Sequence, residues 1–403
     1  MKFPSSLRAP WLLGTALLLG ACGKEATTTP TPSAPDSATD ILVSDERAQI
    51  GDPEFDPYTG RICWQSITDH KIWVCKIDPA TGKLAVGNGQ QTLVDGGDVV
   101  PLTSTFNAGE WAFIQAGAAI VYTKNSGGSR YVAVATETGA AGTSAATWTL
   151  NTLMATPNRF LPRATKNPND NVAAFQCATS PGTGTTKYKF FNNPGTEFSI
   201  GSFSDAHWAE DEQVLTGILP NSQVGLFNPA TPTAAPVQLT QSSGTTYSRP
   251  YMWRAPDQGN ARMFFAKANG NEIRVFKETA PGSNTYAPFQ QFRCPSTNPA
   301  YVNIGSPEPV IYKGKSYITF MASASPLETS GLPAEIWLAS VSATAPTYKM
   351  VSDAAVRVRT DPESYPTATN LYVYYTEVDD AATPDGNLDP TTILRLRRCE
   401  TGL

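Results

Sequence analysis

Three short segments of the chain place a glutamate directly after a proline, just ahead of a β-rich stretch: Pro53-Glu54, Pro307-Glu308 and Pro362-Glu363. Two of these pairs follow an aspartate, Asp52 and Asp361. Because proline fixes the local φ angle, the three segments are expected to share one turn geometry. Carboxylates that converge from different parts of the chain could transfer protons or bind a ligand. The alternative is that these acids only cap turns and hydrogen-bond nearby backbone amides.

The three segments belong to a quasi-repeat that runs along the whole chain. Seven similar turn-then-strand starts lie near residues 52, 108, 161, 205, 249, 306 and 361. Short β-rich segments bounded by Gly, Pro, Asn or Asp lie between them, for example 61–67, 71–77, 262–268 and 371–378. Such a unit with four short strands is typical of a propeller blade. The sequence therefore predicts an all-β, β-propeller fold with seven blades of four-stranded antiparallel sheets. The alternatives are five or six blades with insertions, or a pair of β-sandwiches.

Composition supports this fold class and narrows the possible partners. Only 16% of the residues are charged, the formal net charge is −5, and no basic patch points to nucleic acid. No long segment has the apolar spacing of an amphipathic helix. Several aromatic residues lie in the repeat starts and could form a ligand platform or fill the gaps between blades, namely Trp111, Trp208, Trp253 and Tyr312. Glu54 and Glu363 are further candidate ligand-binding residues.

The carboxylate segments also carry a family resemblance. The sequences "SPEPVIYKGKSYITFMAS" (306–323), "TDPESYPTATNLYVYYTE" (360–377) and "GDPEFDPYTGRICWQS" (51–66) resemble Glu- and Asp-containing segments of glycoside hydrolase family 43. The resemblance implies a propeller with a carboxylate cluster and a sugar substrate. Glu308 would match the general acid, and Asp52 or Asp361 the general base. The family propeller has five blades, and Pro-Val follows Glu308 in place of a Gly-containing pair.

The first residues read as an export signal. Lys2 and Arg8 precede a short apolar run, 11–19, which is too short to span a bilayer. Leu19-Gly20-Ala21-Cys22 resembles the lipobox of bacterial lipoproteins, which implies lipid on Cys22, and Gly23 in the next position implies sorting to the outer membrane. The expected organisation is a signal peptide at 1–21, a disordered Thr- and Pro-rich tether at 22–44, and a propeller domain at 45–403. Removing the signal peptide with its two basic residues changes the net charge to −7.

Five cysteines remain after lipidation. Cys63 and Cys75 flank a turn centred on residue 69, so they are predicted to face each other in a hairpin and to form a disulfide, with two buried free thiols as the alternative. Cys294 with Cys399 is a second candidate pair. A calcium candidate lies in an acidic loop at Asp385, Asn387 and Asp389, with a plain surface loop as the alternative. No other metal or cofactor is expected, because the chain has no CxxC and only two histidines.

These observations lead to three hypotheses for function. The first is a lipid-anchored envelope protein whose propeller binds a polysaccharide or a protein partner without catalysis. The second is a family 43-like glycoside hydrolase that uses Glu308 with Asp52 or Asp361. Inverting hydrolysis of this kind needs an acid and a base about 6.5–9.5 Å apart. The third is a structural scaffold in an envelope complex.

Overall fold

The computed structural model describes residues 36–56, 58–85, 92–102, 107–114, 117–139, 146–154, 156–165, 174–178, 185–191, 193–210, 212–326, 331–379 and 392–403. All of them belong to one compact unit, Pro32–Leu403. The described elements are almost entirely strands, and the one exception is a short 3-10 helix, η1 (Pro256–Gln258). None of these elements is a helix long and apolar enough to cross a bilayer.

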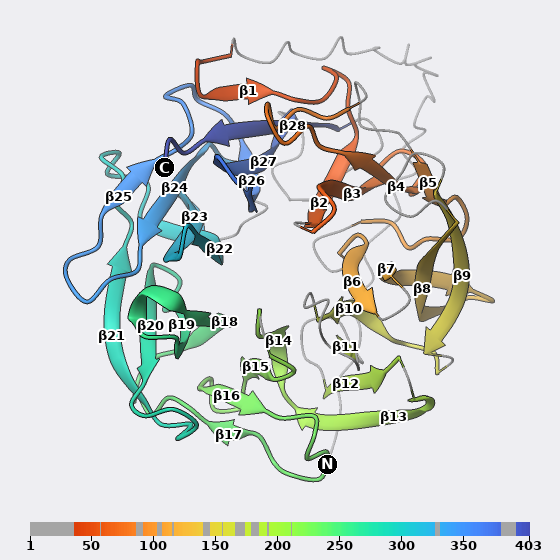
Figure 1. Ribbon diagram of the computed structural model, residues 1–403, viewed down its shortest axis with the longest axis horizontal. Helices are drawn as coiled ribbons and strands as arrows, with labels where there is room; N and C mark the ends of the chain where they lie inside the picture. The colour runs from red at the N-terminus through yellow and green to blue at the C-terminus, as the bar shows by residue number, and fades with distance from the viewer. Residues whose placement is uncertain are drawn as a thin grey trace, which may run out of the picture. The chain divides into compact units, whose positions relative to one another are not determined.

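The strands form seven four-stranded sheets arranged around a common axis (Figure 1). Six sheets use consecutive strands, and the seventh combines the last three strands with the first. We number them by position in the chain. Sheet 1 is β2–β5, sheet 2 is β6–β9, sheet 3 is β10–β13, sheet 4 is β14–β17, sheet 5 is β18–β21, sheet 6 is β22–β25, and sheet 7 is β26–β28 with β1.

The strands that begin sheets 1 to 7 lie nearest the axis in Figure 1. These inner strands are β2 (Ile50–Asp56), β6 (Glu110–Ile114), β10 (Phe160–Ala164), β14 (Ser204–Trp208), β18 (Tyr247–Ala255), β22 (Asn303–Tyr312) and β26 (Arg359–Pro366). The second strands are β3 (Arg61–Ser66), β7 (Gly117–Ser126), β11 (Ala174–Ala178), β15 (Leu215–Ile218), β19 (Ala261–Ala268), β23 (Lys315–Ser323) and β27 (Leu371–Asp379).

The third strands are β4 (Ile72–Lys76), β8 (Ser129–Gly139), β12 (Thr185–Phe190), β16 (Val224–Phe227), β20 (Glu272–Glu278), β24 (Ala334–Ser340) and β28 (Ile393–Glu400). The outer strands are β5 (Thr92–Asp95), β9 (Ala146–Met154), β13 (Asn193–Ser202), β17 (Val237–Gln238), β21 (Tyr286–Arg293), β25 (Tyr348–Met350) and β1 (Asp40–Leu42). Neighbouring strands within each sheet run antiparallel, as an antiparallel propeller blade requires.

Each sheet buries both faces against its neighbours. One apolar core joins sheets 1 and 2 around Trp111, and another joins sheets 5 and 6 around Trp253. The core between sheets 7 and 1 combines Phe55 with Tyr365 and Tyr374, so the last sheet packs on the first. A sheet that packs on both faces cannot be stable alone, and the ring supplies both partners. The predicted all-β propeller fold is confirmed, and its seven sheets match the seven repeat starts.

The N-terminal segment completes the ring. Strand β1 is the outer strand of sheet 7 and pairs with β28 through Asp40↔Cys399, Ile41↔Arg398 and Leu42↔Arg397. The folded domain therefore begins before the boundary expected at residue 45, since Asp40–Leu42 is part of a sheet. The sequence does not indicate this strand, because it follows a Thr- and Pro-rich segment and contains only two apolar residues, Ile41 and Leu42.

A buried ion pair holds β1 in place. The Asp40 side chain is 0% exposed and accepts a 3.0 Å hydrogen bond from Arg397 Nε, which comes from the partner strand β28. Tyr375 donates its hydroxyl hydrogen to Asp40 Oδ2 at 3.0 Å, and the backbone N–H of Asp353 donates to the same oxygen at 3.1 Å. Arg359 adds a second positive charge 3.9 Å away. The desolvated carboxylate is thus compensated by partners from three other segments of the chain.

The expected disulfide between Cys63 and Cys75 is wrong. Neither residue forms a disulfide, because the strand register pairs Cys63 with Val74 and Ile62 with Cys75. A shift of one residue from the assumed register sends the two side chains to opposite faces of sheet 1. Cys63 therefore lies in the core shared with sheet 2, and Cys75 in the core shared with sheet 7.

The other expected cysteine pair is also absent. Cys294 and Cys399 are both free and lie in different cores. The calcium candidates Asp385, Asn387 and Asp389 and the lipidation candidate Cys22 lie outside the described residues. No cluster of possible metal ligands occurs among the residues that are described.

Replacing Asp40 by Ala should destabilise the propeller strongly. The change removes the buried carboxylate that Arg397 and Arg359 share. Glu377 and Asp353 still pair with these arginines, so the expected cost is that of leaving buried donors unsatisfied, about 1–3 kcal/mol. Urea unfolding of the wild-type chain and the variant would measure the loss.

Asp36→Ala is the matched control, since Asp36 binds the same Arg397 at 2.7 Å but its side chain is 47% exposed. Its loss should cost less than about 1 kcal/mol. Equal effects of the two substitutions would contradict a closing role for the buried pair.

Candidate functional site

The inner strands share a local distortion that defines the candidate site. In six of them the pairing register shifts by a bulge just after the repeat start. The residue at the bulge has a positive φ angle in each case: Asp52, Leu161, Asp205, Arg249, Ser306 and Asp361. A bulge of this kind bends the strand and re-aims the side chains that follow it. The predicted repeat starts are therefore equivalent positions in space as well as in sequence.

Two residues after each repeat start, one side chain from every sheet occupies the same register position. We call this set the inner ring: Glu54, Glu110, Arg163, His207, Tyr251, Glu308 and Glu363. Each lies on the sheet face that packs against the next sheet. For example, Glu54 is paired across the strands with Cys63 and then Val74, and both of these lie in the core between sheets 1 and 2. All seven side chains are ionisable or aromatic. Four of the seven are carboxylates, supplied by sheets 6, 7, 1 and 2.

Neighbouring members of the inner ring touch one another. The Tyr251 hydroxyl donates to Glu308 Oε1 at 3.5 Å, and the Tyr251 ring lies 4.0 Å from the imidazole of His207. On the other side, Arg163 Nε is 3.8 Å from Glu110 Oε1. The ring is thus divided into an acidic part and a part with Arg163, His207 and Tyr251, so it can present both hydrogen-bond acceptors and donors to a ligand.

Bonds between sheets fix the backbone of the ring. Asp52 Oδ2 accepts a 2.6 Å hydrogen bond from the backbone N–H of Ala108, the repeat start of sheet 2. Asp205 accepts the same kind of bond from the backbone N–H of Arg249, the repeat start of sheet 5. Trp111 and Trp208 donate from their indole nitrogens to the carbonyls of Glu54 and Arg163, each at 3.0 Å. The repeat-start aspartates therefore have a structural task in addition to any chemical one.

Asp52 and Asp361 share a hydrogen bond between their carboxyl groups, so one of them carries the proton. Burial and the nearby charges of Asp52, Glu308 and Glu54 hold the pKa of Asp361 well above its ordinary value. Burial and the charge of Glu110 also raise the pKa of Asp52, although its bond from Ala108 acts in the opposite direction. Asp361 is therefore the proton donor of the pair and Asp52 the acceptor.

The basic and aromatic part of the ring is also electrostatically coupled. Burial opposes the charge on Arg163, but the nearby carboxylate of Glu110 favours it, and the pKa of the guanidinium is raised. Burial and the charge of Glu308 hold the pKa of Tyr251 well above its ordinary value, so this phenol remains a hydrogen-bond donor. The charges on the two sides of the ring thus depend on each other.

The sequence-predicted carboxylates do gather at one place. Glu308, Asp361 and Asp52 come from the adjacent sheets 6, 7 and 1 and interact electrostatically, and Glu54 joins the same cluster. The predicted aromatic residues lie elsewhere: Trp111, Trp208, Trp253 and Tyr312 are all buried in the cores between sheets, with no more than 6% of their surfaces exposed. Such side chains fill space between the sheets, which was the alternative considered for them.

Sequence reasoning missed several ring residues as members of one set, namely Glu110, Arg163, His207 and Tyr251. A signal for two of them was present, because a proline precedes five of the seven ring positions: Pro53, Pro162, Pro250, Pro307 and Pro362. Proline is tolerated on an edge strand or at a bulge. Each of these five prolines lies at the bulge of an inner strand, which is an edge strand of its sheet. Searching for proline alone, rather than for Pro-Glu, would have aligned Arg163 and Tyr251 with the three glutamates.

Comparisons with known proteins agree on the fold alone. No family model matches the chain, and no curated protein matches it. Among solved structures, the chain is similar to the β-propeller domain of Cps50 (Swd1) from Myceliophteria thermophila, with a TM-score of 0.54 and 9% sequence identity. The match covers 89% of this chain and 99% of that domain. The chain is thus a β-propeller protein.

Replacing Asp361 by Asn should change how stability depends on pH. A carboxyl with a raised pKa in the folded state binds its proton more tightly there than in the unfolded chain. Stability is therefore lost as the pH rises above about 3.9, the ordinary value for aspartic acid. The substituted amide cannot ionise and can still donate to Asp52, so the variant should match wild type near pH 4 and melt a few degrees higher near pH 8. Thermal unfolding across this range would measure the difference.

Asp69→Asn is a control of opposite sign. Burial opposes ionisation of Asp69, but hydrogen bonds from Lys71 and Ser66 outweigh it and lower the pKa. Asp69 therefore adds stability above its unfolded pKa, and removing it should lower the melting temperature slightly at neutral pH. A decrease at pH 8 in Asp361→Asn as well would contradict the raised pKa of Asp361.

Proposed function

We propose that this chain is a lipid-anchored, extracytoplasmic propeller that recognises a ligand at the inner ring, without turning it over. The supporting observation is that all seven sheets place an ionisable or aromatic side chain at the same position around the axis. Ionisable groups are costly to gather in a confined place, and perturbed groups of this kind concentrate at functional sites.

A polysaccharide is the ligand class that this ring suits best, with a protein of the cell envelope as the second choice. Carboxylates accept hydrogen bonds from hydroxyls, while Arg163 and the Tyr251 hydroxyl donate to them. The rings of His207 and Tyr251 lie against each other at a tilt of 33° and add aromatic groups next to Glu308. A scaffold role in an envelope complex would use the same anchored domain without a ligand at the ring.

A glycoside hydrolase is the second candidate function. It is favoured by the cluster of Glu308, Asp361 and Asp52 on adjacent sheets and by the proton that Asp361 retains. General acid catalysis needs a carboxyl that is still protonated at working pH, which fits Asp361 better than the expected acid Glu308. In this version Glu308 would act as the base. The bond from Ala108 to Asp52 favours a positioning role for that aspartate.

Replacing Glu308 by Gln should weaken ligand binding at least about tenfold, because the amide no longer offers a charged acceptor to hydroxyls. Glycan-array binding and sugar-release assays on the purified full chain would measure this. Binding without release supports recognition, and release that Glu308→Gln and Asp361→Asn both abolish supports the hydrolase.

Glu335→Gln is the control, since Glu335 lies in the same sheet 6 but on the third strand, β24. No binding and no release from any polysaccharide would contradict both functions. The search would then turn to envelope proteins that co-purify with the chain.

The proposed anchor has its own test. Cys22→Ala removes the only thiol that could carry the lipid in the lipobox-like segment, so the protein should move from the membrane to the soluble fraction. Several acyl chains are needed for stable attachment, and each buried methylene contributes about 0.8 kcal/mol. Cell fractionation and labelling with a radioactive fatty acid would follow the change.

Cys294→Ala is the matched control, because this thiol is free and partly exposed in the folded domain. It should leave both attachment and labelling intact. Continued membrane attachment of Cys22→Ala would refute the lipid anchor.

A further inference from the structure

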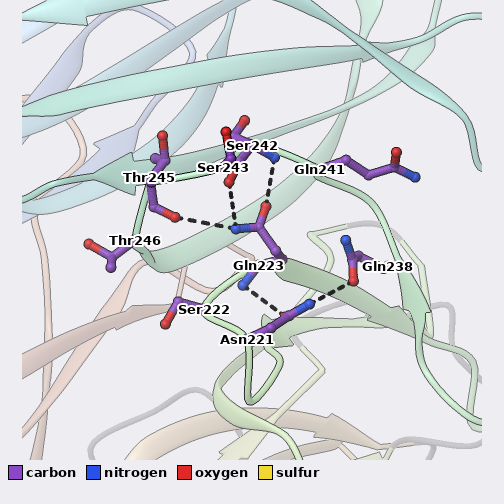
Figure 2. A pocket seen from close by; sticks show the side chains of 10 residues that line it. Asn221, Ser222, Gln223, Gln238, Gln241, Ser242, Ser243, Thr245 and Thr246 are labelled. Carbon is purple, nitrogen blue, oxygen red and sulfur yellow. Dashed lines mark hydrogen bonds between the residues drawn. The ribbon is translucent and has the colours of Figure 1, made fainter.

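A second polar hollow lies at one end of sheet 4, and no residue of the inner ring lines it (Figure 2). One wall is the turn between β15 and β16, with Asn221, Ser222 and Gln223. The other is the connection from β17 to β18, residues 241–246, and Gln238 on β17 completes the lining. Every lining side chain is an amide or a hydroxyl, apart from one glycine. No acid, base or aromatic ring takes part.

The two walls are held together by one buried amide. Gln223 is 7% exposed, and its Nε2 donates to the carbonyls of Ser242 at 3.1 Å and Thr245 at 3.2 Å. Its Oε1 accepts from Ser242 N at 3.0 Å and from Thr240 Oγ1 at 2.9 Å. These four bonds use the full capacity of the amide. Gln223 is therefore not available to a ligand, and it fixes the loop that is.

Further bonds make the loop rigid at its far end. The backbone N–H of Tyr247 donates to the Ser222 carbonyl at 3.1 Å, and the Tyr247 hydroxyl lies 3.0 Å from Ser242 Oγ. The backbone N–H of Thr246 donates to Asn269 Oδ1 at 3.1 Å. A loop that is already ordered loses little conformational entropy when a ligand binds, so weak polar contacts can suffice.

The groups that face solvent remain able to bind. Gln241 and Ser243 are exposed. Their side chains and that of Ser222 make no hydrogen bond to other described residues. Asn221 and Gln238 bond to each other at 2.9 Å, which leaves further acceptor and donor capacity on both amides. The hollow thus offers several fixed neutral donors and acceptors.

The charge near the hollow is balanced. Arg274 reaches Thr245 Oγ1 at 3.3 Å, but its guanidinium is paired with Glu272 at 2.5 Å. A charged ligand would therefore lose its hydration without gaining an ionic partner. A neutral ligand rich in hydroxyls would exchange its bonds to water for equivalent bonds to amides and hydroxyls.

We propose that this hollow is a binding subsite for a neutral saccharide, formed by Asn221, Ser222, Gln238, Gln241 and Ser243 on a loop fixed by Gln223. The site does not involve the inner ring, and its proposal does not depend on the function of that ring. Because no aromatic ring stacks on the sugar, affinity for a single short oligosaccharide should be weak, with a dissociation constant on the order of 1 mM.

The test uses the purified full chain and neutral oligosaccharides, namely α-linked and β-linked glucans and mannans, with an oligogalacturonate as the charged comparison. Saturation-transfer NMR detects binding in the millimolar range. Combining Gln241→Ala with Ser243→Ala should weaken binding of a neutral glycan about fivefold or more, since two exposed polar contacts are lost. Both changes are at the surface, so the fold should persist.

Two controls separate this site from the inner ring. Thr231→Ala changes an exposed hydroxyl on the opposite connection of the same sheet and should leave binding intact. The Gln241 and Ser243 substitutions are also compared in a Glu308→Gln background, where binding at the inner ring is already weakened, so that a further loss is assigned to the hollow. Absence of binding by every neutral oligosaccharide at about 10 mM overturns the inference. Binding that is lost in Glu308→Gln and kept in the Gln241 and Ser243 variant also overturns it, while that result supports ligand recognition at the inner ring.

Discussion

The propeller depends on the contact that closes its ring. Sheets 1 to 6 are each built from four consecutive strands, whereas sheet 7 is incomplete until β1 pairs with β28. The closure rests on the carboxylate of Asp40, which is fully buried between Arg397, Tyr375 and the backbone of Asp353. An ion pair buried this deeply adds little net stability over an apolar pair of the same shape. It does select one register for a strand of three residues, because any slip would break the buried pair between Asp40 and Arg397.

The closure at sheet 7 also brings together the carboxylates of the inner ring and its bulges. Asp361 comes from the last sheet and Asp52 from the first, so their shared hydrogen bond exists only when the ring is closed. The acidic part of the ring spans this junction, with Glu308 before it and Glu54 after it. The same junction therefore joins the first and last strands of the described chain and gathers the carboxylates.

Much of the fold could be predicted from the sequence, because blade-length repeats with short β-rich segments specify a propeller more strongly than any single strand does. The carboxylate cluster could also be predicted, since Asp52 and Asp361 stand at repeat starts and Glu308 follows another repeat start by two residues. The absence of a disulfide between Cys63 and Cys75 could not be predicted, because it depends on the register of one hairpin to within a single residue. The position of β1 could not either, since its partner Arg397 lies 357 residues away in sequence.

The inner ring and its bulges show that a repeated acidic motif can have both a structural and a chemical role. Two of the three aspartates at the bulges accept hydrogen bonds from backbone amides of the next sheet, Asp52 from Ala108 and Asp205 from Arg249. Six bulges share a positive φ angle although only three of them contain aspartate, so the bulge is a feature of the fold and does not require an acid. The side chain two residues later varies from Glu to Arg, His and Tyr while its position stays constant. Structural constraint is thus concentrated at the bulge, and chemical variety is concentrated at the ring position, which is where a binding specificity can change without altering the fold.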